Sequence, residues 1–405
     1  MDPQTLIDRT LSEGLPGLAG GLPAPYWFVQ LFKVLGFTLH MVPMNLWFAG
    51  LLLAVWLHWR GGEHGKRFGA RLMAQMPILV AFGINLGIVP LLFLQLAYAK
   101  VFYPATILMA WFWLAIVVLL IPAYYGVYVY AFGLRGQMAG WKRAAGWLSA
   151  GLFVAIGFLF ANGLSLMTNV GGWEGWWART NVAGAPVGIA LNLFDPTLWP
   201  RWLLMFGLAL GTTAAWCAID ATWLPEPEKG TGLICRNGPE GAPHKLDLSP
   251  FPVGYRAWAG RFSLQLMTVG ALWVVVVGAW YLFGTWPSAV RSQMFSGLWI
   301  VLTGLTALAP GLPWLLLFLG RNEPLSRGRA AAVGLAQLGV LAVNAVSRQV
   351  VQNLELKPYL DVAAVPVAPD WGAMALFLGT FVLGAGMVAW MLVQVRLSAR
   401  GSQEG

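Results

Sequence analysis

The sequence predicts an all-α membrane protein, a polytopic bundle of about nine transmembrane helices with its N-terminus outside and its C-terminus inside. Hydrophobic residues make up 58% of the 405 residues, and mean hydropathy is +0.67. Only 10% of the residues are charged, against roughly 25% in soluble domains. A chain of this composition cannot cover a water-exposed surface with polar groups. It is therefore not a cytosolic globular enzyme, a disordered chain or a disulfide-linked secreted domain.

The spans follow from the apolar runs, because a membrane-crossing helix needs about 20 mostly apolar residues. The breaks between the runs carry charge, proline or glycine, as in "RGGEHGKR" and "GRNEPLSRGR". The sequence contains nine such runs, at 28–58, 73–97, 106–134, 145–168, 201–223, 262–284, 293–319, 330–350 and 371–396.

We expect one transmembrane domain over residues 26–397, preceded by a polar segment at 1–25 and followed by a tail at 398–405. The first residues have no cationic start, so no cleavable signal peptide is predicted. A long loop at 224–261 is predicted on the cytoplasmic side. An outer loop at 170–200 is rich in tryptophan, which favours an interfacial belt over a binding platform.

The basic residues set the predicted orientation. The loops 60–72, 134–144, 224–261 and 320–329 and the tail after residue 395 hold most of the 25 Lys and Arg residues, and the alternate loops hold few. By the positive-inside rule these basic loops are cytoplasmic, which predicts a multi-pass protein of the cell inner membrane. The net charge of +9 belongs to these loops, so no nucleic-acid partner is expected.

Ionisable side chains within the spans are few: Lys33, His40, Asp220 and Arg348. Each is costly in hydrocarbon and needs a partner or a function. We expect Lys33 to reach the outer interface along its aliphatic stem and Asp220 to lie at the inner interface. Met294 begins the seventh span on the same side as Lys33. The polar and soft-ligand residues thus converge on the outer half of the bundle, where we predict any site to lie.

His40 is the histidine deepest in a span. Met44 and Trp47 follow at i+4 and i+7 and share its helix face, and Pro43 is expected to kink the helix. An imidazole at this depth can bind haem iron axially. The alternative is a buried histidine hydrogen-bonded to a neighbouring helix. No CxxCH motif is present, so no covalently attached haem is expected.

Several stretches, taken in order over about residues 25–350, resemble subunit I of the cytochrome bd quinol oxidases. They are "FTLHMVPMNLWFAGLLL", "FGINLGIVPLLFLQ", "AYYGVYVYAFG", "FANGLSLMTNVGGW", "LNLFDPTLWPRWLLMFG" and "NAVSRQVVQN". The resemblance implies the same number and direction of helices. It also places His40 where the family has the haem ligand of its first helix.

The departures from this family pattern limit what the resemblance implies. Where the family has a second haem-ligand histidine, residues 201–205 read "RWLLM", although Met294 lies near the position of its methionine partner. No carboxylate occurs between residues 109 and 132, where the family has two glutamates, and the family's quinol loop shortens to "GTWPSAVRSQ". Oxygen reduction, and quinol oxidation at that loop, are therefore not expected.

The sequence thus predicts an integral membrane subunit of a respiratory electron-transfer complex. It would hold at most one b-type haem at His40, with Met44 or an open sixth position, and a quinone near the outer face is left open. Met294 is a further candidate ligand, and Arg348 with Gln349 could hold a haem propionate, or Arg348 could instead contact headgroups or loop carbonyls. The expected partners are other membrane or periplasmic redox subunits such as a c-type cytochrome.

Three other functions stay open from the sequence. The chain could be a redox-silent membrane anchor for a periplasmic redox partner, or an active quinol oxidase with unusual haem ligation. A transporter or channel is disfavoured, because the spans lack a charged pathway and inverted-repeat symmetry. No catalytic residue is predicted, and enzymatic activity is left undecided.

Overall fold

The computed structural model describes residues 21–224 and 254–401, whose regular elements are helices apart from one short hairpin. In chain order the elements are α2 (Tyr26–Asn45), η1 (Leu46–Gly50), α3 (Leu51–Arg60), α4 (Glu63–Ala97), α5 (Ala99–Leu108), α6 (Ala110–Arg135), α7 (Gly140–Thr168), η2 (Val170–Gly172), α8 (Trp173–Thr180), β1 (Asn181–Val182), β2 (Ala185–Pro186), α9 (Leu198–Asp220), α10 (Tyr255–Ala279), η3 (Trp280–Thr285), α11 (Ser288–Met294), α12 (Trp299–Leu308), α13 (Gly311–Leu319), α14 (Arg327–Leu356), η4 (Val362–Ala364) and α15 (Trp371–Gly401).

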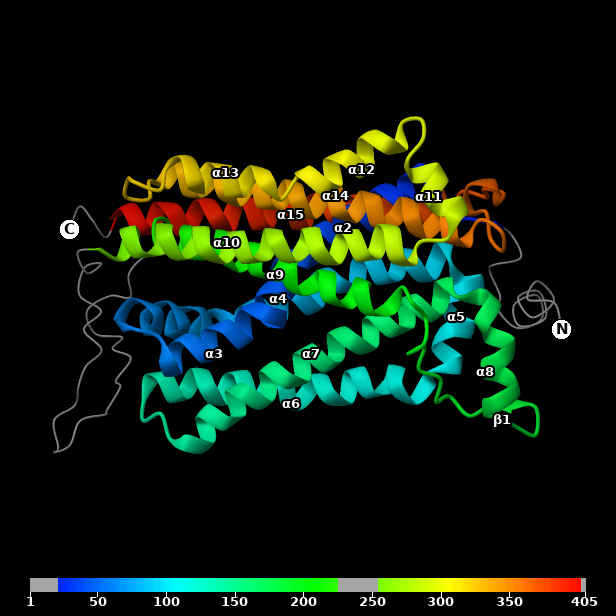
Figure 1. Cartoon of the computed structure of the whole chain (residues 1–405), viewed down its shortest axis with the longest axis horizontal. Coiled ribbons are helices and arrows are strands. Elements are labelled where there is room, and N and C mark those ends of the chain that lie inside the picture. Colours follow the sequence, from blue (N-terminus) through cyan, green and yellow to red (C-terminus); the bar gives the residue numbers. More distant parts are fainter. Residues whose placement is uncertain (1–20, 225–253, 402–405) are drawn as a thin grey trace.

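The described ranges contain nine helices long and apolar enough to cross a membrane, which confirms the predicted all-α bundle. Helix α2 begins at one end of the bundle and α15 ends at the other, as an odd number of crossings requires (Figure 1). The orientation and the identity of the membrane stay predictions. These spans are Tyr26–Arg60, Glu63–Ala97, Ala110–Arg135, Gly140–Thr168, Leu198–Asp220, Tyr255–Thr285, Trp299–Leu319, Arg327–Leu356 and Trp371–Met391.

The helices pack in a defined arrangement around α9. Helix α9 packs against α10 and α14 and also contacts α2, while α6 and α7 form an antiparallel pair on the other side of α4 (Figure 1). A Cβ atom on Gly270 of α10 would lie 2.9 Å from the Gly207 carbonyl oxygen of α9. Glycine at this position therefore lets the α9 and α10 backbones approach closely, as in many membrane bundles.

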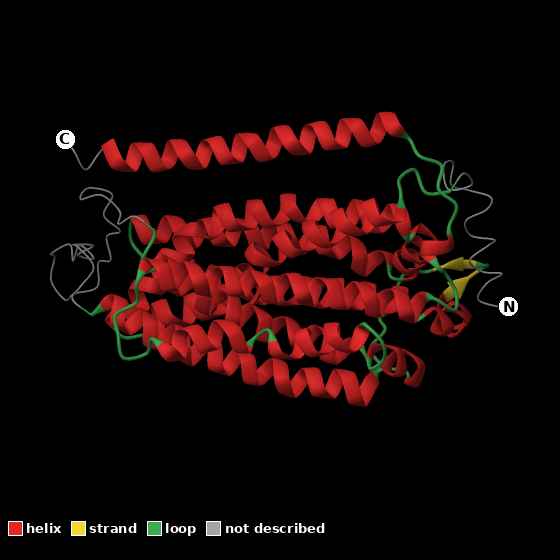
Figure 2. Ribbon diagram, turned by 90° about the horizontal axis from the view of Figure 1, so that it is seen from above, coloured by secondary structure: helices red, strands yellow, loops and turns green. Residues whose placement is uncertain are grey.

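Helix α15 lies along one side of the bundle and stands apart from it over most of its length (Figure 2). Its contacts come from its N-terminal half, where the rings of Phe377 and Phe381 lie 4.9 Å and 5.4 Å from the ring of Phe32. No part of its most apolar window is buried by the rest of the chain. The N-terminal half of the helix therefore packs against α2 and α4, and most of its other described side chains are exposed.

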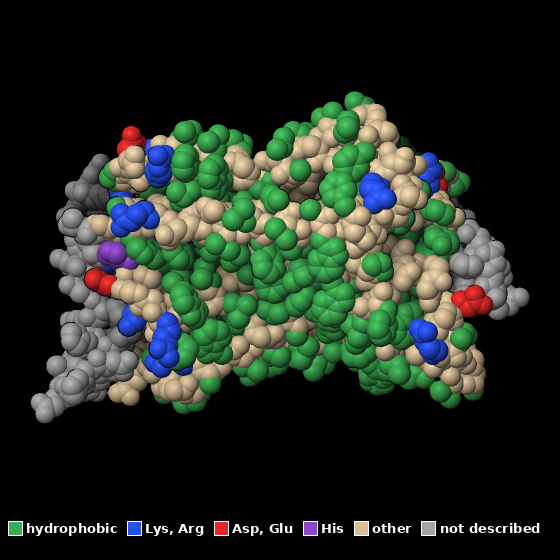
Figure 3. Space-filling view, in the orientation of Figure 1, with side chains coloured by type: hydrophobic (Ala, Val, Ile, Leu, Met, Phe, Trp, Pro, Cys, Tyr) green, Lys and Arg blue, Asp and Glu red, His purple; other side chains and the backbone are tan. Residues whose placement is uncertain are grey.

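The surface agrees with a membrane location. Hydrophobic side chains cover the middle of the molecule, and Lys and Arg gather at its two ends (Figure 3). Exposed leucine, valine and aromatic side chains on α6, α10 and α15, such as Val117, Val276 and Leu383, contribute to this belt. In water such a belt would be unstable, whereas in a bilayer it is the expected lipid contact.

The first span is interrupted just after Pro43, the residue at which the sequence predicts a kink. Pro43 lacks a backbone N–H, so one hydrogen bond of the helix ladder is lost. The helix then takes a π-helical turn at Leu46–Gly50 before it continues as α3. Local π turns of this kind are known causes of bends in long helices.

The seventh span is confirmed as Trp299–Leu319, but it begins later than the predicted run at 293–319 and is less regular. Helix α11 ends at Met294, and a turn with Gly297 in the left-handed region (φ 52°) leads into α12. A second break at Ala309 and Pro310 separates α12 from α13. Proline and glycine explain both breaks, since neither position favours continued helix.

Two predicted loops, at 60–72 and 224–261, are shorter in the structure, because the helices that follow them begin earlier. Helix α4 begins at Glu63, and α10 begins at Tyr255. Arg67 and Arg71 therefore lie on α4 and not in a loop. Hydropathy does not mark such helix ends, because a charged first turn remains helical outside the hydrocarbon. The centre of the predicted loop 224–261 and most of the two terminal segments lie outside the described residues.

The outer loop at 170–200 is ordered by its own short elements. It contains α8 and the β1–β2 hairpin, whose turn places Ala183 and Gly184 at positive φ. Trp173 is buried in the core, and its indole N–H donates to the Leu166 carbonyl at 2.8 Å. The prediction of an interfacial belt is therefore wrong for Trp173.

Candidate functional site

A cavity of about 110 Å³ lies among five helices; we call it the outer cavity. It lies toward the ends of α2 and α14 that are predicted to face outside. Its walls are apolar and aromatic, with one histidine and several cationic or amide side chains. The lining residues are Lys33, Val34, Phe37 and His40 of α2, Gly87, Pro90, Leu91 and Leu94 of α4, Trp113 of α6, Phe160 and Leu164 of α7, and Ala345, Arg348, Gln349 and Gln352 of α14.

The His40 ring is held by helix α4. Its Nδ1 lies 2.8 Å from the Gly83 carbonyl oxygen. A carbonyl oxygen only accepts, so Nδ1 carries the proton and Nε2 keeps its lone pair. A Cβ atom on Gly87 would lie 2.8 Å from His40 Cε1, so only glycine lets the ring lie against this helix. The predicted alternative of a histidine bonded to a neighbouring helix thus describes Nδ1, while Nε2 has no hydrogen-bond partner in the described residues.

Two cationic side chains line the same cavity. Lys33 is only 7% exposed, and its Nζ has no hydrogen-bond partner among the described groups. The ammonium lies 4.0 Å from the centre of the Tyr98 ring. Arg348 places its guanidinium carbon 4.3 Å from the centre of the Phe37 ring. Lys33 is therefore buried, and the expectation that it reaches the outer interface is wrong.

No carboxylate occurs among the described residues that line the outer cavity. Ring faces attract cations, but their attraction is weaker than a buried counter-ion. Gln352 adds another unsatisfied group, since it is 7% exposed and its Nε2 has no partner in the described part of the chain. The cavity thus combines positive charge, free hydrogen-bond donors and one imidazole acceptor.

Gln349 belongs to a hydrogen-bond network on the outer wall. Its Nε2 donates to the Tyr98 hydroxyl at 2.7 Å and to Asn353 Oδ1 at 2.9 Å. Asn353 in turn donates from Nδ2 to the Tyr26 hydroxyl at 2.9 Å. Burial raises the pKa of Tyr98, so the phenol stays neutral in this network. The network holds α14 against α2 and the start of α5, and it fixes the outer wall of the cavity.

The structure places Met44 and Met294 outside the lining of the outer cavity. Met44 packs beside the cluster of Met41 and Leu208, on the side of α2 that faces α9 and α14. Met294 is buried in a separate small cluster with Trp286 and Val351. Of the predicted site residues, His40, Arg348 and Gln349 are brought together, and the two methionines are not.

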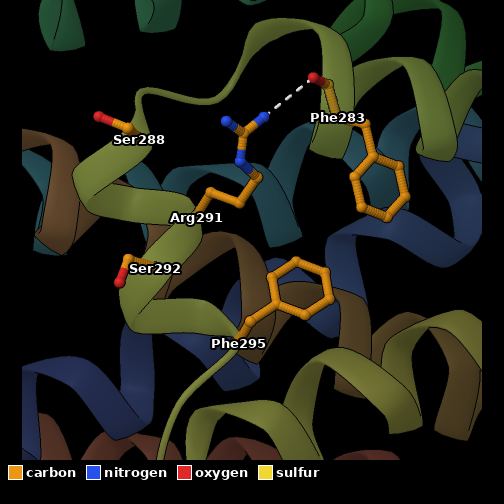
Figure 4. Close-up of a pocket in the computed structure, with 5 residues that line it drawn as sticks. All are labelled: Phe283, Ser288, Arg291, Ser292 and Phe295. Atoms are coloured by element: carbon orange, nitrogen blue, oxygen red, sulfur yellow. Dashed lines mark hydrogen bonds between the residues drawn. The ribbon is translucent and has the colours of Figure 1, made fainter.

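A second hollow, of about 370 Å³, opens at the surface between the end of η3 and helix α11. It is lined by Phe283, Ser288, Arg291, Ser292 and Phe295. Figure 4 shows the Arg291 side chain reaching toward Phe283, and its Nη1 donates to the Phe283 carbonyl at 3.0 Å. Both phenylalanines are partly exposed, and Arg291 is held by its own loop. This hollow presents fewer converging polar groups than the outer cavity.

A buried ion pair lies at the other end of the bundle. Arg71 Nε donates to Asp220 at 2.9 Å, and the Tyr255 hydroxyl donates to the same carboxylate at 3.0 Å. The side chains of Arg71 and Asp220 are 5% and 1% exposed. Asp220 is the last residue of α9, at the end of the helix as predicted, but its side chain is buried within the bundle, where the pair joins α4, α9 and α10.

Sequence reasoning also missed two polar sites near the outer ends of the helices. Arg201 pairs with Glu355 of α14 and donates from Nε to the Tyr281 hydroxyl at 2.9 Å. Asp195 accepts from the Thr197 backbone N–H at 2.8 Å and also binds Ser165. Both carboxylates lie outside the predicted spans, so the rarity of charge within a span gave no signal for them.

No protein-family model matches this sequence, and a search of curated proteins finds no match. The resemblance to subunit I of the cytochrome bd oxidases therefore depends on the quoted stretches alone.

Proposed function

We propose that this chain is an integral membrane subunit of a respiratory electron-transfer complex, a divergent relative of cytochrome bd oxidase subunit I, and that its outer cavity binds the head of a quinone. One observation carries the proposal. Lys33, His40, Arg348 and Gln352 line one apolar cavity, and within the described residues Lys33 Nζ and Gln352 Nε2 are buried without a hydrogen-bond partner.

The size of the cavity favours a small ligand over a large one. The outer cavity measures about 110 Å³, somewhat less than the roughly 150 Å³ cavity that takes up benzene, so a single ring enters only with a small displacement of the lining side chains. Its walls include Phe37, Trp113 and Phe160. Aromatic and apolar walls with a few polar groups at fixed positions are the usual make-up of a small-molecule site.

The position of the cavity supports a ligand with an apolar tail. Phe160 of α7 lines the cavity and is 36% exposed on the lipid-facing side of the described molecule. Leu91 and Leu164 are partly exposed beside it. A ligand dissolved in the bilayer could therefore place its tail between α4 and α7 while its head enters the cavity.

The side chains have distinct roles in this proposal. Lys33 and Gln352 donate hydrogen bonds to ring oxygens, and Arg348 adds positive charge. His40 Nε2 accepts a hydrogen bond from a ring hydroxyl, because the Gly83 carbonyl fixes its tautomer. A bound quinone supplies the electron-carrying chemistry, and an external redox subunit such as a c-type cytochrome exchanges the electrons.

Equilibrium dialysis with a short-chain ubiquinone tests the proposal on the purified full chain in detergent. We expect saturable binding that His40→Ala weakens by about tenfold, the size of one lost hydrogen bond of about 1.4 kcal/mol. Lys100→Met is the matched control, because Lys100 is an exposed lysine at the same end of the bundle. Binding that is absent, or equal in His40→Ala and the parent protein, would contradict the proposal.

One b-type haem is the second candidate ligand. The specific observation in its favour is the Nδ1 hydrogen bond of His40 to Gly83, which leaves Nε2 free to face a metal. Lys33 and Arg348 are suitable partners for propionates. The volume of the cavity does not favour haem, although the side chains do. Sites for ligands of drug size measure roughly 300–1,000 Å³, and the outer cavity measures about 110 Å³. We therefore rank the quinone head above haem.

A dithionite-reduced minus oxidised spectrum with pyridine haemochrome quantification separates the two candidates. About one b-type haem per chain, lost in His40→Ala, would replace the quinone proposal with haem ligation. Binding of neither haem nor quinone would contradict both candidates and favour the redox-silent anchor. Quinol-dependent oxygen uptake by the purified chain would instead support an oxidase of unusual ligation.

A further inference from the structure

We infer that the outer cavity holds its ligand as an anion, so that it binds a ring with an ionised oxygen more tightly than a neutral ring of the same shape. This inference deepens the proposed function and rests on it. The ligand class is an acidic ring compound, such as an ionised quinol or a hydroxyquinone, with its oxygens toward Lys33 and Arg348.

Two other arginines within the bundle have a carboxylate partner. Arg71 is paired with Asp220, and Arg201 is paired with Glu355. Buried charges are normally neutralised in this way, because an unpaired charge in a low-dielectric interior is costly. Arg348 lines the outer cavity without a carboxylate from the described residues. A negative ligand would give this guanidinium the counter-ion that the fold gives the other two.

Lys33 makes the same point independently. It is more than nine-tenths buried, it faces the cavity, and its Nζ lacks a hydrogen-bond partner in the described structure. The ring of Tyr98 covers one side of the ammonium. A lysine without function at this depth would reach the interface along its stem. The described conformation instead keeps its donor directed to the cavity wall.

Neither Glu355 nor Asp195 can act as the counter-ion of Arg348, because each already has its own partners. Glu355 lies on α14 two turns beyond Arg348, but it is already bound by Arg201. Asp195 lies in the loop before α9 and is satisfied by Ser165 and Thr197. Positive charge at the outer cavity therefore stays without a protein counter-ion in the described chain.

The unsatisfied donor of Gln352 adds a neutral hydrogen bond to the same ligand. Its Nε2 is buried without a partner among the described residues, whereas Gln349 has both its Nε2 hydrogens engaged. A charge-assisted hydrogen bond is roughly twice as strong as a neutral one. The two cations should therefore decide the preference for an anion, and Gln352 should contribute to both ligands equally.

A matched pair of ring ligands tests the inference. 2-Hydroxy-1,4-benzoquinone is ionised at pH 7, and 2-methyl-1,4-benzoquinone has nearly the same single-ring shape without the charge. Equilibrium dialysis of both against the purified full chain gives the ratio of their affinities. We expect the anion to bind about tenfold or more tightly, which is the effect of one charge-assisted hydrogen bond.

The variants Lys33→Met and Arg348→Met remove one charge each and keep an unbranched apolar side chain. In each, we expect the affinity ratio to fall toward one. Residual binding of the neutral ring, weakened in Lys33→Met by the lost hydrogen bond, shows that the cavity is folded. Lys100→Met should leave the ratio unchanged, because Lys100 is exposed and does not line the cavity.

The outcomes separate this inference from the proposed function. Equal binding of the two rings in the parent protein would overturn the inference and leave the quinone site intact. Binding of neither ring would overturn the proposed function. Displacement of the anionic ring by phosphatidylglycerol at similar concentration would assign the charge to a lipid phosphate and would also overturn the inference.

Discussion

The contact between His40 and Gly87 gives the sharpest prediction about the cavity. In Gly87→Ala the new methyl carbon would lie 2.8 Å from Cε1 and 2.9 Å from Nδ1 of His40. The imidazole ring is rigid, so it cannot relieve this clash by changing its shape. The ring must move away from α4, and its hydrogen bond to the Gly83 carbonyl is weakened. Orientation of Nε2 toward the cavity is then lost.

The change in the free energy of unfolding of Gly87→Ala has three contributions. Overpacking costs roughly 1–3 kcal/mol, and the weakened hydrogen bond costs about 1 kcal/mol. Alanine in a helix recovers about 0.5–1 kcal/mol relative to glycine. We expect a net destabilisation of roughly 1–3 kcal/mol. Gly339→Ala is the matched control, because no atom lies within 4 Å of its added Cβ, and it should be neutral or slightly stabilising.

Thermal unfolding in detergent, followed by intrinsic fluorescence, measures the stabilities, and quinone dialysis measures the site. Gly87→Ala should unfold at lower temperature than Gly339→Ala and bind the ring more weakly. In a His40→Ala background the Gly87→Ala change should lose its cost, since the clashing ring is absent. An equal penalty in both backgrounds would refute the described contact between His40 and Gly87.

Three further substitutions test the polar sites. Asp220→Asn leaves a buried arginine without its counter-ion and should cost about 3–5 kcal/mol, seen as a large fall in thermal midpoint; an unchanged midpoint would contradict the burial of this pair. Glu355→Gln should lower the midpoint more than Glu323→Gln, because Glu323 is 72% exposed in its ion pair and exposed pairs contribute about 0–1 kcal/mol. Asp195→Asn should speed amide hydrogen exchange in the loop before α9, and unchanged exchange would show that this carboxylate does not order the loop.

The spans were predictable because lipid contact requires long apolar helices, and such runs are visible in composition alone. The ends of α4 and α10 were not, since charged first turns resemble loops in hydropathy. The break at Pro310 was hidden inside one continuous apolar run. Its proline is visible in the sequence, but proline is tolerated within membrane helices and so gave no firm signal.

Part of the candidate site was predictable, because ionisable residues are rare within membrane spans and therefore stand out in the sequence. This rule singled out His40 and Arg348, and the structure places both at one cavity. It gave no signal for Gln352, which is uncharged and becomes notable only because its buried donor has no partner in the described residues. The burial of Lys33 depends on the position of Tyr98 at the end of α4. Contacts between distant helices of this kind cannot be read from one sequence.

Photoaffinity labelling with an azido-quinone tests the central claim most directly, because it reports where the head of the ligand lies. The purified chain would be labelled with and without an excess of unlabelled quinone and mapped by peptide mass spectrometry. Our account predicts protectable labels on the segments of α2, α4 and α14 around His40, Gly87 and Gln352. Protectable labels confined to the hollow around Arg291, or the absence of protectable labelling, would contradict it.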